Sequence, residues 1–254
     1  MADGNPNELT LELRAEDWQK ILESVRKNPK ILFLSKTFRR LVAVRRAEKL
    51  NLPMLVKEVP ENSILNTIPH NAVMMPKFLE AHSARLTNAL VTIDPIFGRE
   101  SEASILCIGP RNEMELFLLY GLGFAPANVK AIDLISNSPL ISVGDMHAIP
   151  YPDSSFDAVL CGWTLSYSRK HQLAVDEMVR VCRPGGLIAV GLSYIPVGHE
   201  DRTLTESQGS ICYDSLAPLL ALFGSHAAEV PFRHEPLDKT RKGALMAVVR
   251  VSKT

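Results

Sequence analysis

The stretch "SILCIGPRNEMELFLLYG", residues 104–121, contains an apolar strand pattern, a turn at Gly109 and a helical pattern. The same alternation of apolar strands and helices continues through residues 128–134, 156–162, 169–182 and 187–192. Near-continuous apolar strands separated by helices predict an α/β fold, in which a mainly parallel sheet is covered on both faces. This part of the chain is therefore expected to form the sheet domain.

The two ends of the chain depart from this alternation. The strand patterns over 226–236 and 243–251 have no helix between them, so they predict an antiparallel β-hairpin at one edge of the sheet. Before residue 100 the chain has amphipathic helical patterns over 14–28, 36–50 and 77–90, with irregular structure expected over 51–76. We therefore predict an N-terminal helical extension over residues 1–100 and a sheet domain over residues 101–254.

Composition excludes several function classes. The 254 residues carry 28 basic and 28 acidic side chains, which argues against a nucleic-acid or membrane partner. The arginines of the 36–50 pattern are expected to be a solvated face, with a phosphate-binding face as the alternative. No apolar run approaches the roughly 20 residues that span a bilayer, and the polar start lacks a secretory signal. The four cysteines and seven histidines show no metal-ligand spacing. We expect a cytoplasmic protein without a metal.

Three segments resemble a known family. "GDMHAIPYPDSSFDAVLCGWTLSY" (144–167), the helix end "EMVRVCRPGG" (177–186) and the strand "LIAVGL" (187–192) resemble class I S-adenosylmethionine-dependent methyltransferases. The resemblance covers about residues 104–193 and implies a Rossmann-like, mainly parallel seven-stranded sheet with an antiparallel C-terminal β-hairpin. It also implies S-adenosyl-L-methionine as cofactor, and methylation of an O, N, C or S atom.

The resemblance assigns cofactor-binding roles to several residues at strand ends. Asp133 would accept hydrogen bonds from the ribose hydroxyls, and Asp145 would accept one from the adenine amino group. Met146 would place a backbone N–H at the adenine ring. Gly162 and Trp163 would lie beneath the methionine portion of the cofactor, with Trp163 either a cofactor-facing wall or a core residue.

The turn after the first strand departs from the family pattern. The family has an acidic residue two positions before Gly109, where this chain has Cys107. Arg111 and Glu113 stand where further glycines are usual, and Pro110 lacks an N–H donor. Gly109, Pro110, Arg111 and Glu113 are nevertheless expected to contact the cofactor.

Charged side chains in this turn could replace the missing glycines. Arg111 could bind the carboxylate of the cofactor, while Glu113 or Glu115 could bind its ammonium group. Asn112 is a suitable helix N-cap, with Glu115 completing an approximate capping box. A decayed pocket is the alternative interpretation.

A second departure concerns the connection after Asp133. Only about ten residues, including Pro139, lead to Gly144, too few for the usual second helix, so we expect an open loop. The N-terminal helices over 15–90 would then pack over the cofactor edge as a lid.

Catalytic residues are not assigned by the sequence. Methyl transfer depends mainly on positioning, and a base is needed only when the acceptor must lose a proton. Candidates for that base are Tyr167, His171, Tyr194 and His199.

The leading interpretation is a small-molecule or glycan methyltransferase, and its rival is a non-catalytic methyltransferase-like domain that binds a partner protein or another ligand. The chain lacks the GxGxxG motif of NAD-linked oxidoreductases, and its zero net charge argues against an RNA methyltransferase.

Overall fold

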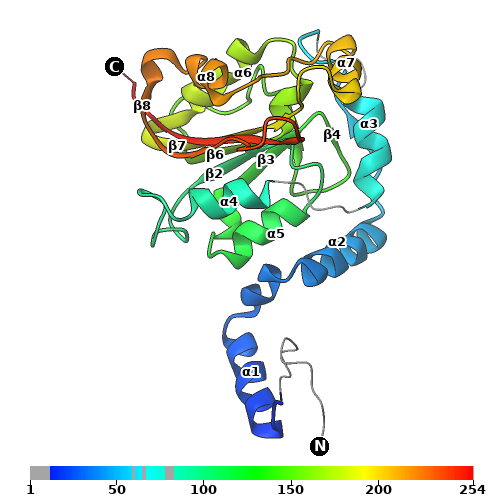
Figure 1. The fold of residues 1–254 in the computed structure, drawn as a ribbon. Coiled ribbons are helices and arrows are strands. Elements are labelled where there is room, and N and C mark those ends of the chain that lie inside the picture. The colour runs from blue at the N-terminus through cyan, green and yellow to red at the C-terminus, as the bar shows by residue number, and fades with distance from the viewer. Residues whose placement is uncertain (1–11, 59–60, 65–66, 78–82, 254) are drawn as a thin grey trace, which may run out of the picture.

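A computed structural model describes residues 12–58, 61–64, 67–77 and 83–253. Seven strands form one sheet in the order β5-β3-β2-β6-β7-β9-β8 (Figure 1). In chain order these strands are β2 (Ile105–Ile108), β3 (Val129–Asp133), β5 (Ser142–Val143), β6 (Phe156–Gly162), β7 (Cys182–Tyr194), β8 (Ala227–His234) and β9 (Gly243–Val251).

The pairing of these strands confirms the expected sheet. From β5 to β7 every neighbouring pair is parallel, whereas β9 is antiparallel to both β7 and β8. β2 has β3 on one side and β6 on the other, so the chain reverses its direction of travel across the sheet at β2. In α/β sheets a ligand crevice forms at the carboxyl ends of the strands beside such a reversal.

Helices cover both faces of the sheet, as Figure 1 shows. One layer contains α4 (Ala84–Leu90) and α5 (Met114–Gly121), and the other contains α6 (His171–Val181) and α8 (Leu216–Ala221). Successive residues of a strand point to opposite faces. In β2, Ile105 and Cys107 therefore pack in the core under α4 and α5, and their neighbours Leu106 and Ile108 pack in the core under α6.

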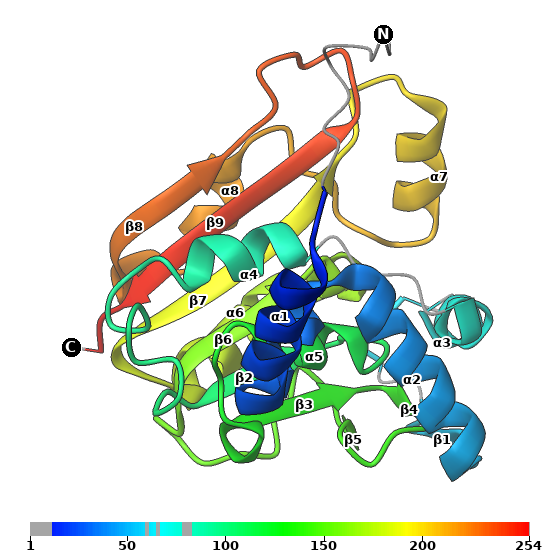
Figure 2. The same ribbon diagram turned by 90° about the horizontal axis from the view of Figure 1, so that it is seen from below.

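The N-terminal extension divides into parts that lie at different distances from the sheet (Figure 1), and Figure 2, seen from the side of α1, shows this helix in front of the sheet domain. α1 (Ala15–Lys27) buries no residue and projects away from the sheet domain, joined to it through the 3₁₀ segment Pro29–Leu34. α2 (Lys36–Leu50) packs against α5. α3 (Thr67–Met74) lies near the carboxyl ends of the central strands.

Two expectations for this extension were wrong in detail. The segment 51–76 contains α3 and the short β1 (Leu55–Val56), which pairs with β4 (Ile135–Ser136). Pro69 is the third residue of α3, where a missing N–H donor has no intrahelical acceptor in any case, so proline does not prevent this helix. Of the expected helix over 77–90, Ala84–Leu90 form α4, whereas Lys77 belongs to the 3₁₀ turn Met75–Lys77; residues 78–82 lie outside the described residues.

The segment after β3 contains no helix, as expected from its length. It instead supplies β4 and the edge strand β5. The remaining elements are a 3₁₀ segment before β3 (Pro126–Asn128) and, after the sheet's edge strand β5, the 3₁₀ segments Thr164–Tyr167 and Gly224–His226 and the helix α7 (Glu200–Ser207).

Candidate functional site

A cavity of about 360 Å³ lies at the carboxyl ends of β2, β3 and β6. This volume falls within the range of small-molecule sites. The turn after β2 contributes Gly109 and Arg111, the end of β3 contributes Asp133, and the end of β6 contributes Gly162 and Trp163. These five residues were all expected at the cofactor site, and the fold brings them to one cavity.

Gly109 is required here by a neighbouring side chain. Its φ is +68°, and a Cβ at this position would lie 2.3 Å from both Oγ1 and Cγ2 of Thr164. The Thr164 hydroxyl donates to the Ile108 carbonyl at 3.0 Å, which holds Thr164 against the turn. The glycine therefore permits close packing of two protein segments.

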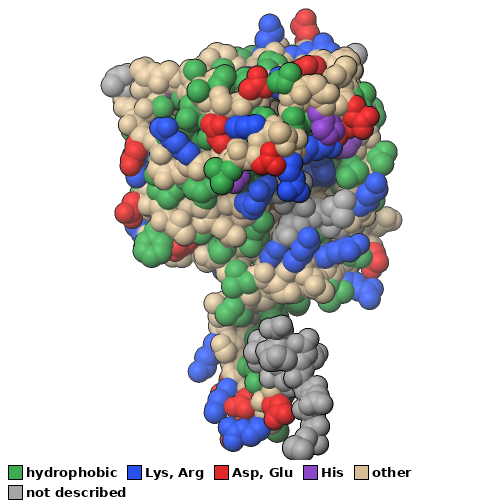
Figure 3. Space-filling model, in the orientation of Figure 1, with side chains coloured by type: hydrophobic (Ala, Val, Ile, Leu, Met, Phe, Trp, Pro, Cys, Tyr) green, Lys and Arg blue, Asp and Glu red, His purple; other side chains and the backbone are tan. Residues whose placement is uncertain are grey.

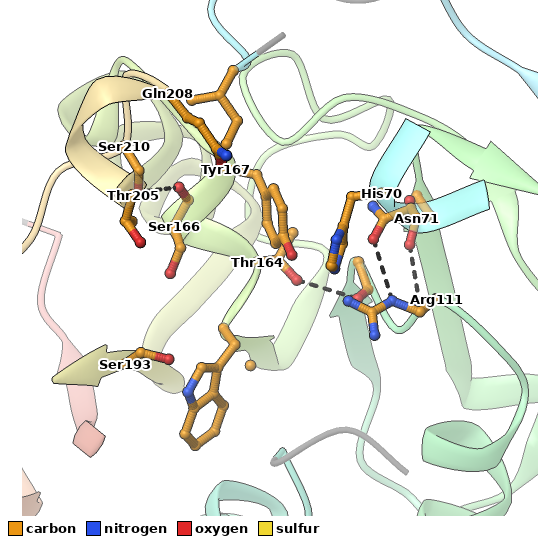
Figure 4. A pocket seen from close by; sticks show the side chains of 15 residues that line it. His70, Asn71, Arg111, Thr164, Ser166, Tyr167, Ser193, Thr205, Gln208 and Ser210 are labelled. Atoms are coloured by element: carbon orange, nitrogen blue, oxygen red, sulfur yellow. Dashed lines mark hydrogen bonds between the residues drawn. The ribbon is translucent and has the colours of Figure 1, made fainter. Parts of the chain in front are cut away.

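Arg111 has a backbone conformation that glycine usually adopts. Its φ of +60° lies in the left-handed region, which is unfavourable for a residue with a Cβ. Its backbone N–H donates to Asp133 Oδ2 at 3.0 Å, and its Nε donates to Asn71 Oδ1 at 3.2 Å (Figure 4). The guanidinium group lies at the wall of the cavity beside Tyr167.

Asp133 is a buried carboxylate at the edge of the cavity. Burial raises its pKa to about 6, against the opposing effect of hydrogen bonds from Ile135, Arg111 and Leu134. The carboxylate is therefore mainly ionised above pH 7. Two carboxylate oxygens offer about four lone-pair sites, so acceptor capacity remains beyond the hydrogen bonds with Arg111 and Ile135.

The two acidic candidates of the turn lie outside this cavity. Glu113 forms an ion pair with Arg46 of α2, with its Oε2 2.7 Å from Arg46 Nε, and accepts from Ser138 Oγ at 2.6 Å. It therefore ties the N-terminal extension to the sheet domain. Pro110 is buried and is likewise absent from the cavity lining.

The expected capping box does not form. α5 has its N-cap at Glu113, without a side-chain capping hydrogen bond, although the Oδ1 of the preceding Asn112 accepts from the backbone N–H of Met114 at 3.0 Å. Glu115 does not reach back to Asn112, because its carboxyl group is buried beside Cys107 and Ser83. Its Oε1 has no hydrogen-bond partner in the part of the chain that the structure describes.

Asp145 belongs to a buried chain of polar groups. Its Oδ1 lies 2.7 Å from Nδ1 of His147, whose Nε2 lies 2.7 Å from the Ser168 hydroxyl. Burial acts to raise the pKa of Asp145, but hydrogen bonds with the ring and the backbone N–H of His147 outweigh it, so the pKa is lowered. Met146 lines a small cavity between Asp133 and Tyr167, next to the main one.

Gly162 and Trp163 form the floor of the cavity at the end of β6. A Cβ on Gly162 would lie 2.5 Å from the Cβ of Ser83, so glycine allows α4 to approach the strand. Trp163 has a φ of +66° and packs over Gly191. Its ring lines the cavity and is partly buried, so it is at once a wall of the cavity and a contact of the core.

The N-terminal extension contributes residues that the sequence analysis missed. His70 and Asn71 of α3 line the cavity, and Figure 4 shows the His70 ring beside Tyr167 and Arg111. Burial and the positive charges of Arg111 and Lys77 lower the pKa of His70, which favours its neutral form at pH 7. Neither residue belongs to a sequence motif, and α3 itself was expected to be irregular, so no signal pointed to them.

Hydroxyl and amide side chains line the opposite end of the same cavity. They come from the Thr164–Tyr167 segment, from the end of β7 and from α7 and its following loop, and they are Ser166, Ser193, Thr205, Gln208 and Ser210 (Figure 4). These groups are uncharged hydrogen-bond donors and acceptors. This end of the cavity therefore suits a polar ligand.

The four candidate bases are dispersed. Tyr167 lines the cavity, whereas His171 binds the Tyr213 hydroxyl at 2.8 Å outside it. Tyr194 donates to the Lys239 carbonyl at 2.9 Å, and His199 caps α7 by accepting from the Asp201 N–H. Only Tyr167 is therefore placed beside the main cavity.

The described residues show neither a metal-ligand cluster nor a membrane-spanning helix. Within the described ranges, no group of three or more His, Cys, Asp or Glu side chains could hold a metal ion. No helix among these residues has both the length and the apolar character needed to cross a membrane.

Comparison with protein families and curated sequences points to methyltransferases. Residues 113–190 match the model of a methyltransferase domain. An uncharacterized protein of Mycobacterium tuberculosis is 49% identical over 43 residues, which are 17% of this chain and 16% of that relative's length. The demethylmenaquinone methyltransferase of Desulfitobacterium hafniense is 35% identical over 74 residues, 27% of this chain and 29% of the relative. Each alignment thus covers less than a third of this chain and less than a third of the relative.

Solved structures share the fold. The N-methyltransferase NodS from Bradyrhizobium japonicum, in complex with S-adenosyl-L-homocysteine, superposes with a TM-score of 0.50 at 17% identity. The superposition covers 76% of this chain and all of NodS (100%). A chain from a Haloferax volcanii complex between a methyltransferase activator and a methyltransferase gives a TM-score of 0.51, at 17% identity, over 76% of this chain and 99% of that one.

Proposed function

We propose that this chain, a member of the class I S-adenosylmethionine-dependent methyltransferase family, transfers a methyl group from S-adenosyl-L-methionine to a small-molecule or glycan acceptor. The observation that carries the proposal is the cavity in which Asp133 and Arg111 meet at the carboxyl ends of the parallel strands. A hydroxyl-binding carboxylate and a carboxylate-binding guanidinium stand on adjoining segments there. A zwitterionic nucleoside needs both groups.

The residues present fit most of the cofactor. Asp133 has acceptor sites left for the ribose hydroxyls, and Arg111 offers donors to the carboxylate of the methionine portion. Among the described residues that line the cavity, Asp133 is the one carboxylate, so the ammonium group would be bound by carbonyl and hydroxyl oxygens around Thr164. The prediction that Glu113 or Glu115 binds the ammonium group is therefore not part of the proposal, since neither lines the cavity.

When bound, the cofactor supplies an electrophilic methyl group on a sulfonium. The chain's own contribution is positioning: the Gly162–Trp163 floor and the hydroxyl-lined end hold an acceptor beside the Asp133–Arg111 end. His70 and Tyr167 line the cavity and are candidate bases if the acceptor must lose a proton. His70 is the better base at pH 7, because its lowered pKa favours the neutral imidazole, whereas burial raises the pKa of Tyr167.

Of the N-terminal helices predicted to act as a lid, we retain only α3 in the proposal. Its residues His70 and Asn71 reach the cavity, and Asn71 is hydrogen-bonded to Arg111, whereas α1 lies away from it. We propose that α3 covers the cofactor side of the cavity.

Asp133→Ala is expected to weaken S-adenosyl-L-homocysteine binding about 30-fold, or about 2 kcal/mol. The substitution removes the charged acceptor for the ribose and also releases the backbone N–H of Arg111. Isothermal titration at pH 8, where Asp133 is ionised, measures the effect. Asp176→Ala is the matched control, since Asp176 is exposed and bound to Gln172 on α6. Equal affinity of the Asp133→Ala and Asp176→Ala proteins would contradict a cofactor site at Asp133.

Arg111→Ala is expected to weaken the same binding about tenfold, through loss of a charge-assisted hydrogen bond to the carboxylate. Arg111→Gly should bind equally weakly, although it should be up to about 1 kcal/mol more stable than Arg111→Ala because glycine adopts positive φ without strain. Titration and urea denaturation separate the two effects. Tighter binding by Arg111→Gly than by the parent would mean that the arginine obstructs the cavity.

One observation favours the second candidate, a non-catalytic methyltransferase-like domain. Asp133 and Asp145 both bind other parts of the chain, the Arg111 backbone and His147, and Pro110 offers no donor. A dissociation constant below about 100 μM for S-adenosyl-L-homocysteine would favour the enzyme. Absence of binding to either form of the cofactor would favour the domain without activity.

A further inference from the structure

A second cavity continues from the hydroxyl-lined end of the first. It has a volume of about 540 Å³, and Ser193 and Thr205 line both cavities. The additional walls come from the start of α4, the end of β7, α7 and the start of β9. A ligand seated at Gly162 and Trp163 could therefore extend past Ser193 and Thr205 into this outer cavity.

Two cationic side chains, Arg85 and Lys242, and one carboxylate, Asp201, line the outer cavity. Figure 3 shows Lys and Arg side chains on the part of the surface below α7. Of the cations near the cavity, Lys242 forms an ion pair with Asp201, and Lys239 forms one with Glu235 at 2.8 Å. Arg85 lines the cavity and forms no ion pair with any residue that the structure describes. Among the described residues, the Asp201 carboxylate also lines this cavity, and it pairs with Lys242 rather than with Arg85.

Trp163 positions the Arg85 side chain. The guanidinium carbon lies 5.4 Å from the centre of the Trp163 ring, a cation–π arrangement. Stacking on the ring leaves the edge of the guanidinium group, with its N–H donors, available to a ligand. The same ring lines the inner cavity, so Arg85 stands at the passage from one cavity to the other.

We propose that the methyl acceptor carries an anionic group, a carboxylate or a phosphate, which Arg85 binds in the outer cavity. This proposal rests on the proposed function and names the acceptor class. The reacting end of the acceptor lies against Gly162 and Trp163, and its middle contacts the Ser193 and Thr205 hydroxyls. Bidentate hydrogen bonding by a planar guanidinium favours carboxylate and phosphate over neutral groups.

The test uses fluorescence of Trp163. The chain has two tryptophans, so a Trp18→Phe background leaves Trp163 as the single tryptophan reporter. Trp18 is on α1, away from both cavities. The probes are benzoate and phenyl phosphate, with benzamide as the neutral analogue, titrated in a low-salt buffer. We expect saturable changes in emission with at least one of the two anions, and binding at least fivefold weaker with benzamide.

Variants assign the effect to Arg85. Arg85→Gln should weaken binding of the anion about fivefold and leave benzamide unchanged. Lys239→Gln removes an equal charge at a residue paired with Glu235, and should change binding less than twofold. Equal loss in both variants would show a general charge effect and overturn the proposal, as would equal binding of benzamide, an unaffected Arg85→Gln protein or no saturable response.

Failure of this proposal is distinguishable from failure of the proposed function. S-adenosyl-L-homocysteine binding is measured separately by calorimetry, and Arg85 does not line the inner cavity. Arg85→Gln should therefore retain the parent affinity for S-adenosyl-L-homocysteine. Intact binding of S-adenosyl-L-homocysteine without anion binding would overturn the acceptor class alone.

Discussion

Gly109→Ala is expected to lower the free energy of unfolding by about 3 kcal/mol. An alanine at φ +68° costs roughly 1–2 kcal/mol of backbone strain, and its Cβ would overlap Thr164, where overpacking costs about 1–3 kcal/mol. Urea denaturation measures the change. Because the overlap also moves Thr164 at the cavity wall, binding of S-adenosyl-L-homocysteine should weaken in parallel.

A second substitution tests the cause. Thr164→Ala removes the two atoms that approach to 2.3 Å and leaves the Cβ at 2.8 Å, so Gly109→Ala should cost less in the Thr164→Ala background than in the parent. Gly185→Ala is the control, since Gly185 has a φ of +76° with open space at its Cβ position. It should show the backbone strain alone. A Gly109→Ala protein no less stable than Gly185→Ala would contradict the role of Thr164.

Between pH 5 and pH 8 the free energy of unfolding of the parent protein is expected to fall about 3 kcal/mol more than that of the Glu115→Gln protein. Burial raises the pKa of Glu115 from 4.5 to about 7, although hydrogen bonds with Ser83 and Cys107 oppose this. The folded state therefore holds a proton that the unfolded chain releases near pH 4.5. Its stabilising contribution is complete below pH 4.5 and is lost as the pH rises toward 7.

The expected measurement is a pair of urea denaturation curves for each protein. Glu115→Gln should match the parent within about 1 kcal/mol at pH 5 and exceed its stability at pH 8, because glutamine keeps the shape without the buried charge. Glu102→Gln is the control at an exposed glutamate paired with Arg99. A constant difference between the Glu115→Gln and parent proteins at both pH values would mean that Glu115 does not titrate in this range.

Local sequence patterns were sufficient to predict the sheet. Runs such as Ile105–Ile108 and Phe156–Gly162 bury nearly every residue, and their near-continuous apolar character shows this without reference to distant parts of the chain. The C-terminal hairpin followed from the missing helix between its strands. The same patterns misplaced Thr67–Met74, because a proline near the start of a short helix gives the same signal as a proline in a loop.

The candidate site was predictable in part. Gly109, Arg111, Asp133, Gly162 and Trp163 follow strands, and parallel strands bring their carboxyl ends to one edge of the sheet, so strand assignment alone places them together. Their functional roles remain predictions. The pairing of Glu113 with Arg46 was not predictable, because the two residues are 67 positions apart in the sequence.

What the sequence determined by itself was the alternation of strands and helices in the sheet domain, and with it the edge of the sheet at which a ligand can bind. Tertiary structure decided which charges face that ligand. Glu113 and Arg111 are two positions apart, yet Glu113 pairs with Arg46 of α2 while Arg111 turns to the cavity and to Asn71 of α3. The direction of each side chain follows from the lowest total free energy of packing and ion pairing with the N-terminal helices. No local pattern contains the positions of those helices.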